Sequence, residues 1–138
     1  MDIPELDLVK IKENRMCFGC GKDNPLSMKL DPYLEGEIAE AKCTPNEFHQ
    51  GWSGYAHGGV LMTILDEIIS YLCYYSNFYV VTAKIDFRIR SMAKIGEPLI
   101  AMARILKLSK RLPGIQADLK RNDGTIIAEA LSVQFVVK

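Results

Sequence analysis

One long helical pattern constrains the fold of this chain more than any other feature. After His57-Gly58-Gly59, apolar residues recur at helical spacing, and neither Pro nor Gly interrupts the run before the chain leaves Asn77. These apolar residues are Val60, Leu61, Ile64, Leu65, Ile68 and Leu72. The helix is apolar around most of its circumference, so we expect other elements to bury it. No second helix of similar length is predicted, and strands must therefore cover it.

Alternating or β-rich patterns predict the strands. They cover residues 27–34, 37–43, 81–89, 99–108, 115–121 and 125–137. Glu35-Gly36 joins the first pair, and Asn122-Asp123-Gly124 joins the last pair with a strong hairpin signal. In strand 81–89 the odd-numbered positions are apolar and should face the core, which leaves Thr82 on the polar face. The sequence thus predicts an α+β fold, with an antiparallel sheet of about six strands wrapped around one central helix.

Composition indicates one domain and excludes several classes of partner. The 138 residues are 49% hydrophobic, and we treat residues 1–138 as a single domain whose first 25 residues are irregular, with a short helix expected at 8–14. The formal net charge is zero, from 17 basic and 17 acidic residues, which argues against nucleic acid and anionic membranes as partners. No uncharged stretch reaches the roughly 20 apolar residues of a membrane span. Met1–Glu5 lacks the pattern of a signal peptide, so a cytoplasmic protein with reduced cysteines is expected.

The residues around the helix start resemble a known family. The segment 48–67, with His57-Gly58-Gly59 and then Asp66 two turns later, resembles the hotdog-fold acyl-CoA thioesterases, in particular the phenylacetic-acid-degradation (PaaI-like) type. Lys84-Ile85-Asp86-Phe87, the turn at 93–98 and the opening Cys17-Phe18-Gly19-Cys20-Gly21 are also similar to that family. The resemblance implies a hotdog fold, hydrolysis of an acyl-CoA thioester to the free acid and coenzyme A, and no cofactor. It also implies a homodimer, or a dimer of dimers, with composite active sites.

Physical chemistry suggests roles for Gly58, Gly59 and Asp66. The first N–H groups of a helix have no partner within it, and glycine would let a thioester carbonyl approach them closely as an oxyanion hole. The alternative is that the glycines only permit a tight turn. A carboxylate in an apolar helix is costly unless it faces a polar cleft or a partner. The resemblance makes Asp66 the catalytic acid, either general base or nucleophile, whereas the adjacent Glu67 should be solvent-facing or structural.

The distance between these groups predicts assembly. Asp66 follows Gly58 by eight residues, which corresponds to about 12 Å along a helix axis. One carbonyl cannot contact the Gly58 N–H and the Asp66 carboxylate of the same helix. If both act on one thioester, they come from two chains.

Three further residues are candidates for the catalytic site. His57 is either a catalytic base or, as we prefer, a residue that holds the loop at the helix start. Some members of the resembled family carry Asn six residues before the motif His, where this chain has Gly51. Either Gln50 supplies the missing amide or the attacking water is positioned differently. Thr82 occupies the strand position where related enzymes place a hydroxyl that orients this water, although a surface β-former would be equally expected there.

Basic and aromatic residues suggest where the substrate binds. Arg88, Arg90, Lys110 and Arg111 are candidates to hold the phosphates of coenzyme A, and ordinary solvated strand residues are the alternative. An aromatic group at the end of the helix could line an acyl tunnel or simply pack in the core. It consists of Tyr71, Tyr74, Tyr75, Phe78 and Tyr79.

Cys17-x-x-Cys20 raises the question of a metal. A structural zinc site needs four ligands, usually from a second such pair, but Cys43 and Cys73 stand alone. The sequence therefore predicts no metal site, and these two cysteines are expected to shape a turn near the substrate channel.

Two other functions fit the same fold less well. A hydratase or dehydratase would need a loop His where this chain has Gln50 and a helix acid where it has Ile64. A non-catalytic acyl-CoA-binding domain would not need an acid at Asp66, so hydrolysis is the preferred prediction.

Overall fold

The helix predicted from the apolar pattern is present as α2, which runs from Gly58 to Tyr75. A computed structural model describes residues 15–107 and 113–137. The other elements are β1 (Tyr33–Glu35), β2 (Ile38–Cys43), the 3-10 helix η1 (Glu47–His49), β3 (Val80–Ile89), β4 (Leu99–Lys107), β5 (Gly114–Arg121) and β6 (Ile126–Val136). No helix in these described ranges is long and apolar enough to cross a membrane.

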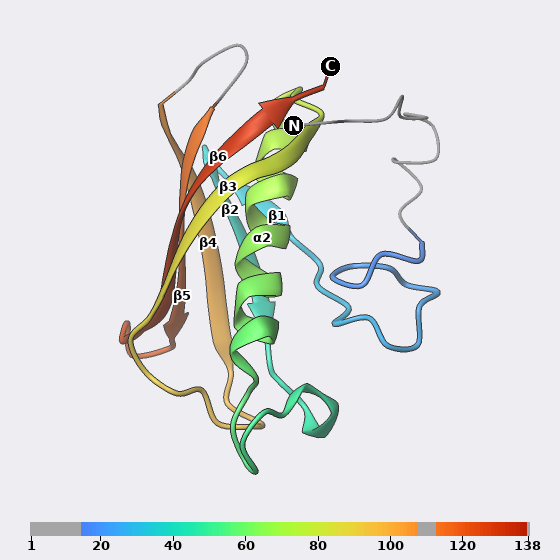
Figure 1. The fold of residues 1–138 in the computed structure, drawn as a ribbon, viewed down its shortest axis with the longest axis vertical. Coiled ribbons are helices and arrows are strands. Elements are labelled where there is room, and N and C mark those ends of the chain that lie inside the picture. The colour runs from blue at the N-terminus through green and yellow to red at the C-terminus, as the bar shows by residue number, and fades with distance from the viewer. Residues whose placement is uncertain (1–14, 108–112, 138) are drawn as a thin grey trace.

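The six strands form one antiparallel sheet in the order β1-β2-β4-β5-β6-β3. The sheet curves around α2, while residues 15–32 lie on the other side of the helix (Figure 1). The predicted hotdog architecture is therefore confirmed. The hairpin between β5 and β6 is also as predicted, with Gly124 at a φ of 90° in its turn.

Side-chain sizes on the helix and the sheet are complementary. The helix contributes large residues that are almost fully buried, namely Leu61, Ile64, Leu65, Ile68, Ile69 and Leu72. The sheet meets them mainly with small buried residues, namely Ala39, Ala41, Ala101, Ala103, Ala117, Ala128 and Ala130. Short alanine side chains let the strands approach the helix closely. Each buried Leu or Ile contributes about 1.5–3 kcal/mol, so the contact between helix and sheet stabilises the fold strongly.

Local residues define both ends of α2. His57 is the N-cap, and its side chain accepts a hydrogen bond from the Gly59 N–H. At the other end Asn77 adopts a left-handed conformation with a φ of 65°. The N–H groups of Asn77 and Phe78 bond back to the carbonyls of Tyr74 and Cys73, which is the pattern of a Schellman motif. The helix therefore stops where the sequence predicts it to stop.

Strand β3 departs from the predicted alternation. Its register with β6 shifts between Thr82 and Lys84, which leaves Ala83 as the extra residue of a β-bulge. Beyond the bulge Ile85 and Phe87 pack against the core as predicted, but Ala83 and Ile89 are exposed. Before the bulge Thr82 faces the helix. The prediction that Thr82 lies on the polar face was wrong, because one inserted residue inverts the alternation.

The first predicted strand was also too long. Residues 27–34 were expected to be extended, but β1 contains only Tyr33–Glu35. Lys29 is left-handed with a φ of 54°, which interrupts extended structure. Its ammonium donates hydrogen bonds to the carbonyls of Gly21, Lys22 and Asn24, so the segment folds back on itself. The helix predicted at residues 8–14 lies outside the described residues.

Candidate active site

A carboxylate–hydroxyl pair links α2 to β3. The Thr82 hydroxyl donates a 2.7 Å hydrogen bond to Asp66 Oδ1, and both side chains are partly buried. Within the described residues no hydrogen bond reaches the other carboxylate oxygen, Oδ2. One oxygen of Asp66 is thus held by the protein, while the second is available to a ligand.

The β-bulge at Ala83 makes this pair, and a buried polar network supports it. Thr82 Oγ1 also lies 3.3 Å from Gln134 Oε1 on β6, and the Gln134 amide donates to the Ser132 hydroxyl. Gln134 is fully buried. Because the Thr82 hydroxyl has one proton, its shorter contact with Asp66 is the hydrogen bond we assign. The sequence analysis missed Gln134 and Ser132, and the available signal was a polar pair at alternate positions of a strand that is apolar apart from Glu129.

The start of α2 leaves one candidate donor free. The Gly59 N–H donates to His57 Nδ1 at 2.8 Å, so it is already engaged. No acceptor for the Gly58 N–H is found among the described residues. A side chain at Gly58 would lie 3.3 Å from Ile89 Cδ1, and one at Gly59 would lie 3.1 Å from His57 Nδ1. Close packing therefore also favours glycine at both positions, which agrees with the alternative that these glycines only permit a tight turn.

His57 and Gln50 both act within the loop before the helix. His57 caps α2, as in the preferred interpretation of this residue. The Gln50 side chain accepts from the Gly54 N–H at 2.7 Å and donates to the Glu47 carbonyl at 2.9 Å. Buried His49 accepts from the Asn46 N–H through Nδ1, and desolvation lowers the pKa of His49. The Gln50 amide thus braces this loop, and its catalytic role stays a prediction.

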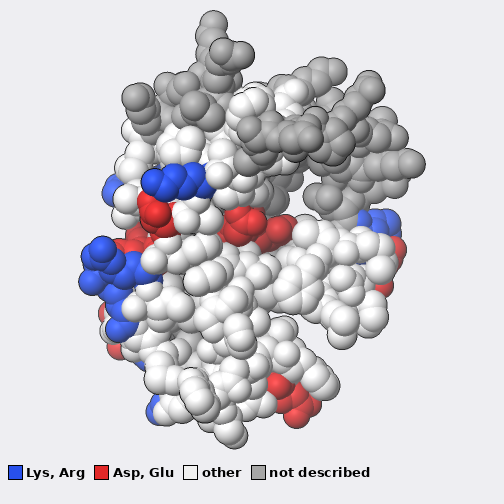
Figure 2. Space-filling model, viewed as in Figure 1, with Lys and Arg blue, Asp and Glu red and all other residues white. Residues whose placement is uncertain are grey.

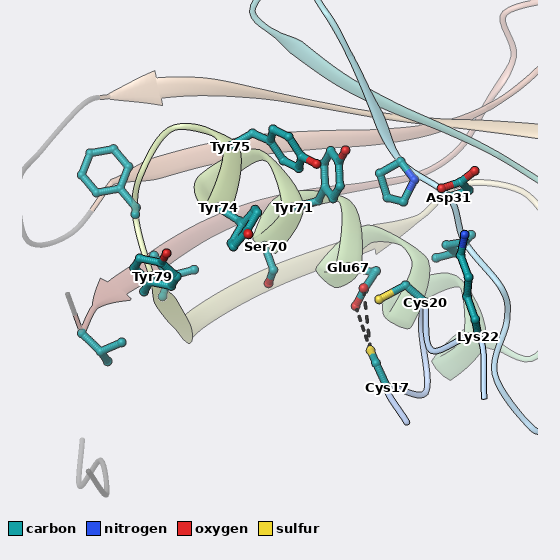
Figure 3. A pocket seen from close by; sticks show the side chains of 15 residues that line it. Cys17, Cys20, Lys22, Asp31, Glu67, Ser70, Tyr71, Tyr74, Tyr75 and Tyr79 are labelled. Atoms are coloured by element: carbon teal, nitrogen blue, oxygen red, sulfur yellow. Dashed lines mark hydrogen bonds between the residues drawn. The ribbon is translucent and has the colours of Figure 1, made fainter. Parts of the chain in front are cut away.

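A cavity of about 480 Å³ lies along the second half of α2. Ser70 lies on its wall and follows Asp66 by one turn on the same helix face. All five aromatic residues predicted at the helix end line it, with Tyr71 and Tyr75 only 4.3 Å apart between ring centroids. Figure 3 shows these tyrosines at one end of the cavity and Cys17, Cys20 and Glu67 at the other. Aromatic side chains thus line one end of the cavity, and the ionisable Lys22, Asp31 and Glu67 lie with the two thiols at the other.

Glu67 is neither solvent-facing nor isolated. Its carboxylate is partly buried and accepts from the Cys17 thiol, with both oxygens 3.7 Å from Sγ. Burial first, and then the neighbouring Glu67 carboxylate, raise the pKa of Cys20. The thiols and the carboxylate therefore form one cluster, which the sequence analysis did not predict because Glu67 is 50 residues from Cys17.

The basic candidates differ in their surroundings. Arg90 is paired with Glu129 at 2.8 Å through Nε. Arg88 is exposed, and no ion pair to it is found in the part of the chain that the structure describes. Lys110 and Arg111 lie outside the described residues. Figure 2 shows basic and acidic side chains interspersed on one face, with a wide uncharged area between them.

Comparison of the sequence with models of protein families identifies the class of protein to which this fold and site belong. A family model described as the thioesterase superfamily matches residues 53–128, more than half of the chain. The chain belongs to the thioesterase superfamily. No curated protein sequence matches it.

Solved structures agree with this family at the level of the fold. A thioesterase superfamily protein has a TM-score of 0.81 at 22% identity; the match covers 88% of this chain but only 60% of that one. The Escherichia coli PaaI protein, from the phenylacetic acid degradation operon, has a TM-score of 0.77 at 16% identity, over 86% of this chain and 84% of the other. A hypothetical thioesterase of Streptococcus pneumoniae, solved with coenzyme A, has a TM-score of 0.74 at 16% identity, over 78% and 88%. The predicted resemblance is thus confirmed.

Proposed function

We propose that this protein hydrolyses an acyl-CoA thioester to the free acid and coenzyme A. The observation that carries the proposal is the Asp66–Thr82 pair, a carboxylate in an apolar helix that keeps one oxygen available. Two further structures of the Streptococcus pneumoniae relative have alanine in place of an aspartate and of a threonine sixteen residues apart, the same spacing as Asp66 and Thr82. The coenzyme A in that relative supports the choice of carrier.

Asp66 has two chemical routes to the same products. As a general base it takes a proton from water, the resulting hydroxide adds to the thioester carbon, and the proton returns to the departing coenzyme A thiolate. As a nucleophile its carboxylate adds to the carbon, expels the thiolate and leaves a mixed anhydride that water hydrolyses. Both routes place negative charge on the carbonyl oxygen, and the Gly58 N–H is the donor we assign to it.

We place the two groups of each site on different chains. The Gly58 N–H and Asp66 are about 12 Å apart along α2, too far to act on one carbonyl. Strand β3 is a ten-residue edge strand, and an open edge of this length favours pairing with a second copy. A hollow beside Gly58, lined by Gly51, Trp52, Ala56, His57 and Gly58, would then receive the carboxylate of the partner. A dimer of dimers is compatible with the same sites.

The proposed substrate position follows from the cavity and the charges. The aromatic cavity along α2 would hold the acyl group and favour an aromatic or medium-length chain. Among the basic candidates Arg88 is best suited to a phosphate of coenzyme A, because Arg90 already has an acidic partner.

Thiol release from a panel of acyl-CoA esters tests the reaction. Asp66→Asn keeps an acceptor for Thr82 but can act neither as base nor as nucleophile, so we expect at least a tenfold loss of kcat/KM, about 1.4 kcal/mol of transition-state stabilisation. Asp66→Ala should lose as much. Asp123→Asn is the matched control, because this exposed acid lies in the turn between β5 and β6, away from β3, and asparagine can still accept from the Thr125 N–H.

The assignment fails if Asp66→Asn retains more than a tenth of the wild-type kcat/KM, or if the wild-type protein releases thiol from no ester. Single turnover in heavy-oxygen water identifies the nucleophilic route when water attacks the Asp66 carbon of the mixed anhydride. Only the nucleophilic route transfers the label into the Asp66 carboxylate.

A further inference from the structure

The loop at 17–21 holds two thiols against a carboxylate of α2. One ligand atom from each of Cys17, Cys20 and Glu67 lies within 4.8 Å of the other two. Ligands bound to one zinc ion at about 2.0–2.3 Å lie roughly 3.5 Å apart, so small side-chain movements would suffice for shared coordination. The contacts between Cys17 Sγ and the Glu67 oxygens, at 3.7 Å, already have nearly that separation.

The surrounding backbone is built to keep this arrangement. A side chain on Gly19 would lie 2.7 Å from Glu67 Oε2, and one on Gly21 would lie 2.4 Å from the Cys17 nitrogen. The Gly21 N–H donates to the Cys17 carbonyl at 2.8 Å, which closes a tight turn around the two cysteines. The Lys29 ammonium holds three carbonyls of the same segment. Gly21 is therefore required for this turn, and Gly19 leaves the space that the Glu67 carboxylate occupies.

We propose that Cys17, Cys20 and Glu67 bind one zinc ion. Paired thiolates select zinc among the common divalent ions, and carboxylate oxygen is an accepted third ligand. Three protein ligands leave a fourth position, which water would occupy from the cavity that all three residues line. The ion would attach the loop at 17–21 to α2 and complete one end of the cavity. This proposal does not depend on the thioesterase reaction.

The proposal differs from the sequence-based expectation of no metal. That expectation rested on the absence of a second Cys-x-x-Cys pair and did not consider a carboxylate as a ligand. The third ligand comes from a helix 50 residues away, and only the packing of the loop on α2 brings it within reach.

Metal binding by the reduced protein tests the proposal. Protein stripped with chelator and kept in a thiol-free reductant should take up one equivalent of zinc when zinc chloride is added, measured by elemental analysis. Cys17→Ser, Cys20→Ser and Glu67→Gln should each weaken zinc binding at least tenfold. Cys43→Ala and Cys73→Ala are matched controls, because these thiols lie outside the cluster, and they should bind zinc as the wild type does.

Cobalt provides an independent readout. Cobalt-loaded protein should show a thiolate-to-metal charge-transfer band that Cys17→Ser weakens and that Cys73→Ala leaves unchanged. Zinc should also raise Tm in the wild type but not in Glu67→Gln, which is nearly isosteric and is the variant to use if the serine variants fail to fold. The proposal is overturned if the reduced protein takes up no stoichiometric zinc, or if Glu67→Gln binds it unchanged. A Cys17–Cys20 disulfide in a protein that binds no zinc when reduced would identify a redox pair instead.

Discussion

The Thr82 hydroxyl lies between two polar side chains, Asp66 on α2 and Gln134 on β6. Its role in the proposed site is to hold one oxygen of the acid so that the other faces the substrate. A hydrogen bond to a charged group contributes about 1.5–3 kcal/mol, so its loss should be measurable both in rate and in stability.

Thr82→Val keeps the shape of the side chain and removes the hydroxyl. We expect kcat to fall roughly tenfold or more, because Asp66 loses its hydrogen bond. Thr82→Ser should restore most of the rate, and thiol-release kinetics on both variants measure this. If Thr82→Val turns over as fast as the wild type while folding normally, the hydroxyl has no role in orienting the acid.

His49 makes stability depend on pH. Desolvation lowers the pKa of His49 below its ordinary value of 6.5, and its Nδ1 must be unprotonated to accept from the Asn46 N–H. Above that ordinary value both states are neutral and the contribution is complete. As the pH falls below it, the unfolded chain binds a proton that the folded chain does not, so the free energy of unfolding decreases. The loss continues until the pH falls through the folded-state pKa.

Urea unfolding between about pH 7.5 and 5.5 measures this effect above the range of ordinary carboxylates. A His57→Asn background leaves His49 as the single histidine of the chain. We expect the free energy of unfolding to fall across this range, and His49→Gln to flatten the profile. An unchanged slope in His49→Gln would assign the pH dependence to another group.

At the level of elements, the start of α2 combines a cap with a candidate oxyanion donor. His57 engages the Gly59 N–H, whereas the Gly58 N–H has no acceptor in the part of the chain that the structure describes. The capping role and a role as base make different demands on the side chain, so substitutions can separate them.

Loss of the cap should affect stability and not chemistry. His57→Ala should lower the free energy of unfolding by about 0.5–2 kcal/mol, whereas His57→Asn should stay near the wild type because Asn is a good N-cap. Both variants should hydrolyse thioesters at nearly the wild-type rate where they are folded. A folded His57→Asn protein with a large loss of kcat would instead make His57 the base.

At the scale of the whole molecule, the open edge of β3 and the 12 Å separation along α2 both favour a dimer with shared sites. An isolated chain would then carry both the Gly58 N–H and the Asp66 carboxylate, but too far apart to form one complete site. This arrangement is testable without a structure of the dimer.

Two inactive variants should complement each other. Asp66→Ala removes the acid, and Gly58→Pro removes the N–H. Proline suits the first helical position, but its ring would approach Ile89. The folding of the Gly58→Pro variant must therefore be checked by circular dichroism. Random reassociation makes half of the dimers mixed with one intact site each, so an equal mixture should recover about a quarter of wild-type activity. A well-folded mixture as inactive as its parents would exclude a site shared between Gly58 and Asp66.

Prediction from sequence worked best for features that depend on local periodicity. The apolar spacing in α2, its end near Asn77 and the Asn122-Asp123-Gly124 hairpin all follow from interactions between near neighbours, and the structure contains each of them. The predicted alternation of buried and exposed residues in β3 was wrong because it considered this strand alone. A bulge is one residue of mismatch between two strands, so the β3 sequence alone could not reveal it.

The sequence by itself determined the helix, the class of fold and the positions of Gly58 and Asp66 on that helix. Only the tertiary structure decided which groups face them. The bulge turns Thr82 toward Asp66, β6 places Gln134 behind Thr82, and the loop at 17–21 brings two thiols close to Glu67. Each of these contacts joins residues far apart in the chain, and their meeting depends on strand register and on the packing of the sheet and the loop around α2. Periodicity carries no information about such contacts, because it describes one element at a time.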